Sequence, residues 1–135
     1  MTLTARLALT KSAPAGVGVS YGHRYHTTEA TTLGLVPLGY ADGVPRAAGN
    51  TVEVLVRGAA RSARCTIAGA VCMDQFVVDL GAINDGAFMA GDEVLLFGPG
   101  DAGEPTAQDW AAALGTISYE VVTRIGPRVP RVYST

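Results

Sequence analysis

Alternation of apolar and polar residues over short runs is the feature that most limits how this chain can fold. Two segments show it clearly, residues 2–10 and residues 51–57. The apolar positions, which the alternation places on one face of each segment, are Leu3, Ala5, Leu7, Leu9, Val52, Val54 and Val56. A period of two residues is typical of a strand with one buried face. The pattern therefore predicts a mostly β protein.

Further apolar runs predict additional strands. They span residues 31–38, 61–68, 75–80 and 92–98. The first run contains Pro37, which favours a short strand or one at a sheet edge. Arg57-Gly58 begins a turn that joins two of the predicted strands into a hairpin. Residues 12–18 and 40–50 are rich in turn-forming residues and are predicted to be irregular.

Helix signals are confined to the last third of the chain. Thr106 is followed three residues later by Asp109, which predicts a capping pair at a helix start, and Gly115 is a suitable stop. A second short helical turn is predicted to start at Thr116 and to carry Tyr119.

Together these elements predict a compact, β-barrel-like domain with one or two short helices, formed by residues 1–135. Closure into a barrel removes exposed strand edges. Residues 126–133, which include two prolines, are predicted to be extended. Because such folds serve many functions, the fold alone does not identify an activity.

Composition and charge exclude several classes of function. Apolar residues make up 48% of the chain, charged residues 16%, and the net charge is −2. We therefore expect no binding of nucleic acid or of an acidic membrane surface, both of which select clustered Lys and Arg. No apolar run approaches the ~20 residues that span a bilayer. Two cysteines, Cys65 and Cys72, indicate neither a disulfide framework nor a zinc site, so we expect a reduced, cytoplasmic protein.

Four short stretches are more specific than a plain β domain requires. They are Ser20-Tyr21-Gly22-His23; Gly39-Tyr40-Ala41-Asp42-Gly43 with Arg46; Cys72-Met73-Asp74-Gln75; and Gly115-Thr116-Ile117-Ser118-Tyr119-Glu120 followed by Arg128-Val129-Pro130-Arg131-Val132-Tyr133. In this order and spacing they resemble the C-terminal domain of bacterial alanine racemases. The resemblance covers essentially the whole chain.

The resemblance implies an architecture for the full-length protein. Such a racemase is a homodimer, and each subunit has an N-terminal (β/α)8 barrel that holds pyridoxal 5'-phosphate on a lysine. The C-terminal β domain of one subunit completes the active site in the barrel of the other. A barrel takes roughly 200 residues or more, so the 135 residues here cannot contain one. We expect the cofactor lysine to lie outside this chain, and we give Lys11 no such role.

The resemblance also implies roles for individual residues. Tyr21 corresponds to the catalytic tyrosine, the second base of the racemisation. Tyr40 lines the substrate site and its entrance, and the loop of Met73 approaches the substrate carboxylate with a backbone N–H. Tyr119 reaches the cofactor phosphate. Each residue also has a plain structural alternative. Tyr21 could simply end a strand, and Tyr40 could be a tyrosine packed in a turn. Met73 could fill the core, and Tyr119 could be a surface residue of a helix.

Other polar residues receive weaker interpretations. Arg46 either lies on the approach corridor, where it attracts a carboxylate, or is simply exposed. Ala70 departs from relatives that have a basic residue before the Met73 loop. Asp74 is expected to order that loop or a subunit contact, and Cys72 to be a buried structural thiol. His23 and His26 are a weak metal pattern, and we predict no metal site.

The sequence thus predicts a domain of an enzyme that interconverts L-alanine and D-alanine and supplies D-alanine for peptidoglycan. The isolated domain is expected to be inactive. A racemase that also accepts serine is a close variant. A stand-alone β-barrel interaction or dimerisation module without catalysis is the alternative from another class. An acidic pI of about 5.6 opposes a nucleic-acid-binding barrel.

Overall fold

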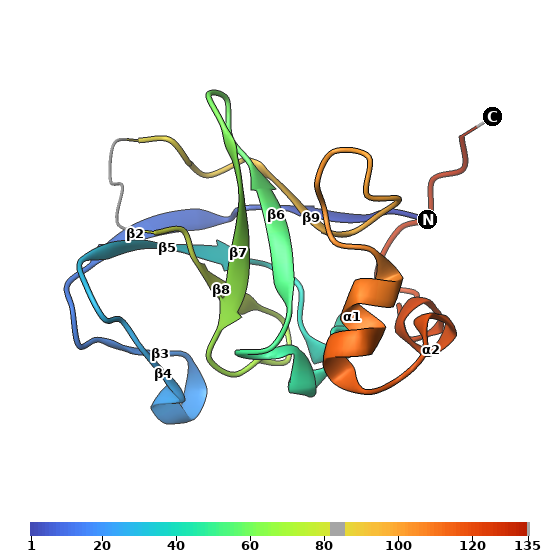
Figure 1. Cartoon of the computed structure of the whole chain (residues 1–135), viewed down its shortest axis with the longest axis horizontal. Helices are drawn as coiled ribbons and strands as arrows, with labels where there is room; N and C mark the ends of the chain where they lie inside the picture. The colour runs from blue at the N-terminus through green and yellow to red at the C-terminus, as the bar shows by residue number, and fades with distance from the viewer. Residues whose placement is uncertain (82–85, 135) are drawn as a thin grey trace.

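The computed structural model describes residues 1–81 and 86–134 as short strands followed by two helices (Figure 1). The strands are β1 (Leu3–Arg6), β2 (Leu9–Ala13), β3 (Gly18–Val19), β4 (Tyr25–His26), β5 (Thr31–Val36), β6 (Glu53–Arg57), β7 (Ser62–Ala68), β8 (Phe76–Asp79) and β9 (Glu93–Phe97). The α-helices are α1 (Ala107–Leu114) and α2 (Ser118–Thr123), and the 3-10 turns are η1 (Tyr21–His23), η2 (Tyr40–Asp42) and η3 (Arg46–Ala48). The predicted mostly β fold with two short helices is confirmed.

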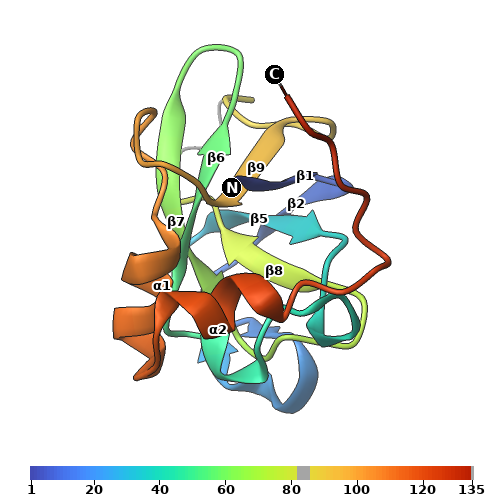
Figure 2. The ribbon, with the colours of Figure 1, turned by 90° about the vertical axis from the view of Figure 1, so that its right-hand side faces the viewer.

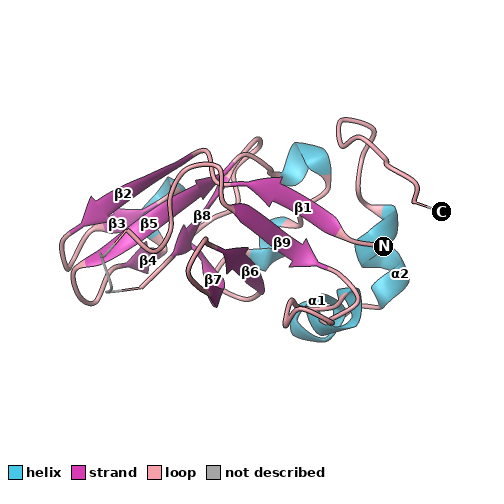
Figure 3. Ribbon diagram, turned by 90° about the horizontal axis from the view of Figure 1, so that it is seen from above, coloured by secondary structure: helices cyan, strands magenta, loops and turns pink. Residues whose placement is uncertain are grey.

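Seven strands form one curled antiparallel sheet in the order β1-β9-β6-β7-β8-β5-β2 (Figure 3). Its two outermost strands, β1 and β2, are separated in sequence only by Leu7 and Ala8. The N–H of Leu7 donates to the Asp92 carbonyl at 2.9 Å, and that of Ala8 donates to the Leu35 carbonyl at 2.8 Å. Because this link touches both ends of the sheet, the sheet is held in a barrel-like curl. β3 and β4 form a separate hairpin.

The prediction of one strand over residues 2–10 is wrong. The chain leaves β9 after Arg6 and joins β5 from Leu9 onward, so the side-chain alternation is interrupted at the link. Leu7 is buried as predicted, but Leu9 is 48% exposed. The predicted loop over residues 12–18 is also shorter, since β2 continues to Ala13.

Inside the curl lies one hydrophobic core, to which the strands contribute mainly β-branched and aromatic side chains. Its fully buried members include Val36, Val54, Val56, Ile67, Phe76, Val78, Val94 and Leu96. Burying one such side chain stabilises a fold by about 1.5–3 kcal/mol. In the strand β6, Val54 and Val56 face this core as their alternation predicts.

The helix α1 starts and ends where the sequence predicts. The Asp109 N–H donates to Thr106 Oγ1 at 3.1 Å, and the Thr106 N–H donates to Asp109 Oδ2 at 2.8 Å, which is a capping box. Gly115 ends the helix with a positive φ of 71°. The second helix begins at Ser118 rather than at Thr116, and it carries Tyr119 as predicted. Figure 2 shows the two helices together at one end of the curled sheet.

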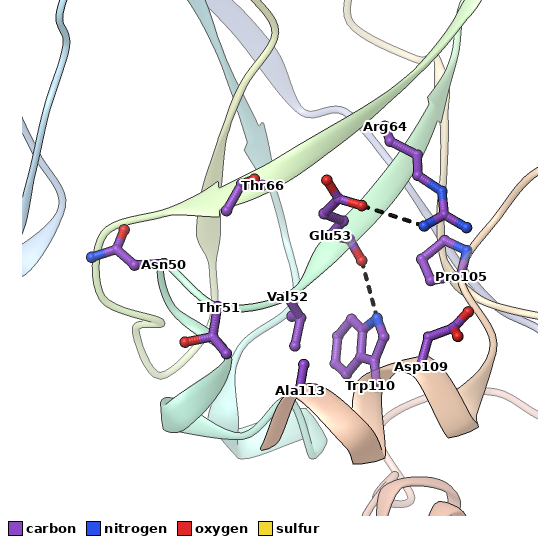
Figure 4. A pocket seen from close by; sticks show the side chains of 10 residues that line it. All are labelled: Asn50, Thr51, Val52, Glu53, Arg64, Thr66, Pro105, Asp109, Trp110 and Ala113. Atoms are coloured by element: carbon purple, nitrogen blue, oxygen red, sulfur yellow. Dashed lines mark hydrogen bonds and ion pairs between the residues drawn. The ribbon is translucent and has the colours of Figure 1, made fainter. Parts of the chain in front are cut away.

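Trp110 fastens α1 to the sheet. Its side chain is only 2% exposed and packs edge-to-face against Phe97, with ring centroids 5.7 Å apart. Its indole Nε1 donates a hydrogen bond of 3.0 Å to the carbonyl of Glu53 on β6 (Figure 4). The ring therefore combines a buried apolar surface with a satisfied polar atom.

Within residues 1–81 and 86–134, no helix is long and apolar enough to cross a membrane.

We expect Trp110→Ala to lower the free energy of unfolding by about 3–5 kcal/mol, because it leaves a cavity under α1. Trp110→Phe keeps most of the ring and loses the hydrogen bond, so it should cost about 1–2 kcal/mol. Urea unfolding followed by circular dichroism measures both. Tyr133→Ala, which truncates an aromatic side chain that is 90% exposed, is the control and should change stability by less than about 0.5 kcal/mol. Equal losses for Trp110→Ala and Tyr133→Ala would contradict the packing described here.

Candidate active site

Tyr21 lies on a tight turn between β3 and β4. It is the first residue of η1, and its side chain is 84% exposed. The backbone has positive φ angles at Ser20 (65°), Gly22 (76°) and His23 (48°). This region favours glycine, so the turn around Tyr21 is strained at two non-glycine positions. Its conformation holds the phenol ring clear of the protein surface.

The stretches that carry Tyr40 and Met73 meet through their backbones. The Tyr40 N–H donates to the Cys72 carbonyl at 3.0 Å, and the Ala41 N–H donates to the Met73 carbonyl at 3.0 Å. Gly39 allows this approach, because a Cβ atom there would lie 2.2 Å from the Cys72 carbonyl oxygen. A glycine is therefore required before Tyr40 for steric reasons.

An open hollow of about 320 Å³ brings most of the predicted site residues together. Its lining residues are Tyr21, Tyr40, Arg46, Ala70, Val71, Cys72 and Met73. Three of the four predicted site residues line this hollow, together with Arg46 and Ala70, the two positions considered for substrate entry. Tyr119 does not, since it lies on α2 outside the hollow with its side chain 74% exposed.

Two polar groups at this hollow are available for a ligand. Among the residues that the structure describes, the Tyr21 hydroxyl has no hydrogen-bond partner. The Met73 carbonyl accepts from Ala41, whereas the Met73 N–H has no acceptor within the same described ranges. Two residues that line one open hollow thus carry a free phenol hydroxyl and a free backbone donor.

Arg128 joins the stretches that carry Tyr40 and Met73. Its Nε lies 3.1 Å from Asp42 Oδ1, and its Nη2 donates to Asp74 Oδ1 at 2.8 Å. The hydrogen bond to Asp74, followed by the charge of Asp42, raises the pKa of the Arg128 guanidinium. Buried Asp42 also accepts the Gly39 N–H at 2.9 Å through Oδ2. Asp74 contributes to loop order through its contact with Arg128, a residue for which no role was predicted.

Comparisons with known proteins identify the family to which this chain belongs. A model of the family described as "Alanine racemase, C-terminal domain" matches residues 1–133. The chain belongs to this family. The alanine racemase of Frankia casuarinae is 68% identical over 98% of this chain, which covers 33% of that protein.

Solved structures of alanine racemases have the same fold over this region. The alanine racemase from Streptomyces coelicolor is 62% identical, with a TM-score of 0.90 over 98% of this chain and 33% of that one. The enzyme from Bartonella henselae, described with covalently bound pyridoxal phosphate, is 29% identical with a TM-score of 0.85, covering 98% and 34%. This chain therefore spans about a third of the alanine racemases that it matches.

The remaining candidate residues of this racemase domain lie elsewhere or have structural partners. The rings of His23 and His26 meet edge-to-face with centroids 6.3 Å apart. In the described part of the chain no three His, Cys, Asp or Glu side chains are grouped as metal ligands would be. Lys11 lies on β2 opposite Leu33 and does not line the hollow. Cys72 is half-buried at the hollow rather than fully buried, and both cysteines are free thiols.

A partly buried hydrogen-bond network that was not predicted from the sequence ties the Tyr21 hairpin to the sheet. The Tyr25 hydroxyl donates to Asp79 Oδ2 at 2.6 Å, and Thr31 Oγ1 donates to Asp79 Oδ1 at 2.5 Å. Burial, and then the hydrogen bond and negative charge of Asp79, raise the pKa of Tyr25 to about 12. β4 of this racemase domain is thereby attached to β8.

The stabilisation that Tyr25 contributes to the fold should be lost at alkaline pH. Below pH 10 the phenol is neutral in both states; between about pH 10 and 12 it ionises in the unfolded chain while the folded chain retains the proton. The stabilisation contributed by Tyr25 therefore falls as the pH rises from about 10 to about 12. We expect Tyr25→Phe to unfold more easily than the unmodified chain at pH 8, by about 1–3 kcal/mol, and the gap to narrow at pH 11.

Thermal unfolding at both pH values measures this gap. Tyr133→Phe is the matched control, because its ring is exposed and it should match the unmodified chain at each pH. A gap for Tyr25→Phe that is the same at pH 8 and pH 11 would show that ionisation of Tyr25 is not linked to folding.

Proposed function

We propose that residues 1–135 form the C-terminal β domain of an alanine racemase, an enzyme that interconverts L-alanine and D-alanine. In this proposal the domain supplies Tyr21 as the second catalytic base at the site of a partner subunit in a homodimer. The observation that carries the proposal is the hollow that gathers Tyr21, Tyr40 and Met73. Membership of the family and the names of the relatives support it.

The chemistry requires two bases. Racemisation removes the α-proton from one face of the amino acid and returns a proton to the opposite face. The exposed phenol of Tyr21 can approach a substrate held by another subunit, since no described residue occupies its hydroxyl. The ordinary pKa of a phenol is about 10, so a tyrosine base needs cationic or hydrogen-bonding neighbours that favour the phenolate. We propose that the barrel of the partner subunit provides them.

The other residues of the hollow bind and orient the substrate in this proposal. The free Met73 N–H donates a hydrogen bond to the alanine carboxylate, and the Tyr40 ring lines the site beside it. Arg46 at the edge of the hollow attracts the carboxylate during entry. Ala70 leaves that entrance with one basic group fewer than in relatives that have a basic residue there.

Pyridoxal 5'-phosphate is the cofactor that this family implies, and the chain fits only part of its binding. The exposed Tyr119 hydroxyl can donate a hydrogen bond to a phosphate oxygen. The sole lysine, Lys11, lies on β2 away from the hollow, so covalent attachment is left to the N-terminal barrel. When bound, the cofactor supplies the electron sink that allows the α-proton to leave. The Bartonella henselae structure, described with covalently bound pyridoxal phosphate, supports this assignment.

The proposed cellular role follows from the activity. The full-length enzyme would supply D-alanine for peptidoglycan in the cytoplasm. The isolated domain has no lysine at the hollow and is proposed to be inactive.

The test uses a chimera in which this chain replaces the matching C-terminal region of the Streptomyces coelicolor alanine racemase. We would follow α-proton exchange of L-alanine and of D-alanine in deuterated water, for the chimera and its Tyr21→Phe variant. Loss of a positioned base should slow exchange from L-alanine by about 10²–10⁴-fold. Some exchange from D-alanine should survive, because the other base serves that face.

Tyr133→Phe is the control variant, and the 135-residue chain alone should catalyse neither exchange. If Tyr21→Phe exchanges both enantiomers at the rate of the chimera, Tyr21 is structural and the site assignment is wrong. Retention of dimerisation without any exchange in the unmodified chimera would favour a module that only pairs subunits. Exchange of serine at a comparable rate would indicate the broader racemase.

A further inference from the structure

The turn that carries Tyr21 has a backbone conformation that its own residues do not favour. Ser20 has φ 65° and ψ −173°, a combination that is almost confined to glycine. His23 is also at positive φ. A strained conformation of this kind persists only when surrounding contacts determine it.

The Ser20 side chain makes a long-range contact rather than a local one. Ser20 occupies the N-cap position of η1, yet it makes no side-chain capping hydrogen bond. Instead its Oγ donates to the Ala70 carbonyl at 2.6 Å and lies 3.5 Å from the Cys72 sulfur. Gly69 leaves room for this approach, since a Cβ atom there would lie 3.0 Å from Ser20 Cβ and 2.7 Å from the Val19 oxygen.

Asn50 makes a second connection between the turn and the segment at residues 69–70. Its Oδ1 accepts the Gly69 N–H at 2.7 Å, and its Nδ2 donates to the Arg24 carbonyl at 3.2 Å. Figure 4 shows Asn50 in the lining of a second pocket, beside α1, which shares no lining residue with the Tyr21 hollow. Asn50 is itself at φ 58°, which asparagine tolerates better than most residues. The turn is therefore held at Ser20 before Tyr21 and at Arg24 after it.

Both connections end on the segment that forms the opposite wall of the hollow. Ser20 and Asn50 attach to residues 69 and 70, and the next residues along the chain, through Met73, line the hollow. A change at either connection consequently alters the separation between the Tyr21 ring and the Met73 loop. The same contacts that maintain the strain set the geometry of the candidate site.

We propose that Ser20 and Asn50 are positioning residues that hold the Tyr21 turn in its strained conformation and so fix the reach of its phenol toward the substrate α-carbon. This inference rests on the proposed function of Tyr21. Neither residue touches the substrate. Each forms a hydrogen bond that connects the turn to residues 69–70. These bonds are needed because the backbone of the turn is strained.

Paired substitutions distinguish the effect of the backbone strain from the effect of the side-chain hydrogen bonds. Ser20→Ala removes the hydroxyl and keeps the backbone strain, whereas Ser20→Gly removes the hydroxyl and the strain together. Asn50→Gly keeps a residue suited to positive φ and removes both side-chain hydrogen bonds. Ser62→Ala, at an exposed position on β7, is the control. All four are made in the same chimera, beside Tyr21→Phe.

We expect Ser20→Ala and Asn50→Gly to slow α-proton exchange from L-alanine by about 10–100-fold, because misplacement by about 1 Å can cost 10²-fold. Exchange from D-alanine should change by less than about 3-fold, since the other base does not depend on this turn. Ser20→Gly should retain more L-alanine exchange than Ser20→Ala. Because glycine suits this backbone conformation better than alanine, a purely structural role would give the same order. The selective loss of exchange from L-alanine is therefore the result that distinguishes a positioning role.

Amide hydrogen exchange of residues 21–24 in the 135-residue chain provides a second readout that is independent of catalysis. It should be faster in Ser20→Ala and Asn50→Gly than in Ser62→Ala. If Tyr21→Phe does not affect catalysis, the proposed function fails, and this readout alone decides whether the two residues hold the turn. If Ser20→Ala does not fold, the inference is tested with Asn50→Gly alone, because Asn50 is exposed and its substitution should be tolerated.

The inference is overturned if Tyr21→Phe abolishes L-alanine exchange while both positioning variants exchange normally. It is also overturned if they slow exchange from the two enantiomers equally, which would indicate general loss of structure. Unchanged amide exchange across residues 21–24 would likewise reject it.

Discussion

The candidate site depends on a close contact between two stretches of backbone, residues 39–41 and residues 72–73. Two hydrogen bonds join them, and the missing side chain of Gly39 allows the chains to come within reach. Arg128 also bridges the carboxylates of Asp42 and Asp74, which directly follow these two stretches in the sequence. Since Tyr40 and Met73 belong to these two stretches, their proximity is a property of the main chain and is insensitive to side-chain rotamers.

Much of the fold could be predicted from local sequence signals. Period-two alternation located β6, and apolar runs located β5, β7, β8 and β9 to within a few residues. The pair Thr106 and Asp109 marked the start of α1 because a capping box involves only residues three apart. Gly115 marked the end of α1, because a glycine readily adopts the positive φ that ends a helix. Such signals are readable because the interactions behind them join neighbours in sequence.

Features that depend on distant partners could not be predicted in this way. The interruption at Leu7 arises because β1 and β2 pair with strands at opposite ends of the sheet. The contacts of Ser20, Asn50 and Tyr25 all join residues far apart in the chain. The structure places Tyr21, Tyr40 and Met73 around one hollow and Tyr119 outside it, and no local sequence signal indicated this grouping. The roles of these four residues stay predictions.

The link at Leu7 and Ala8 also has a consequence for the order in which the domain folds. The β6–β7 hairpin joins residues that are near in sequence, so its loop closes quickly and at small entropic cost. β1 pairs with β9, at the other end of the strand-forming region, and cannot find its partner until that region has been ordered. Because β2 follows β1 after two residues, the pairing of β1 with β9 and that of β2 with β5 must form nearly together. Barrel closure is therefore expected to be a late step of folding, and the N-terminal strands to be the last that are protected.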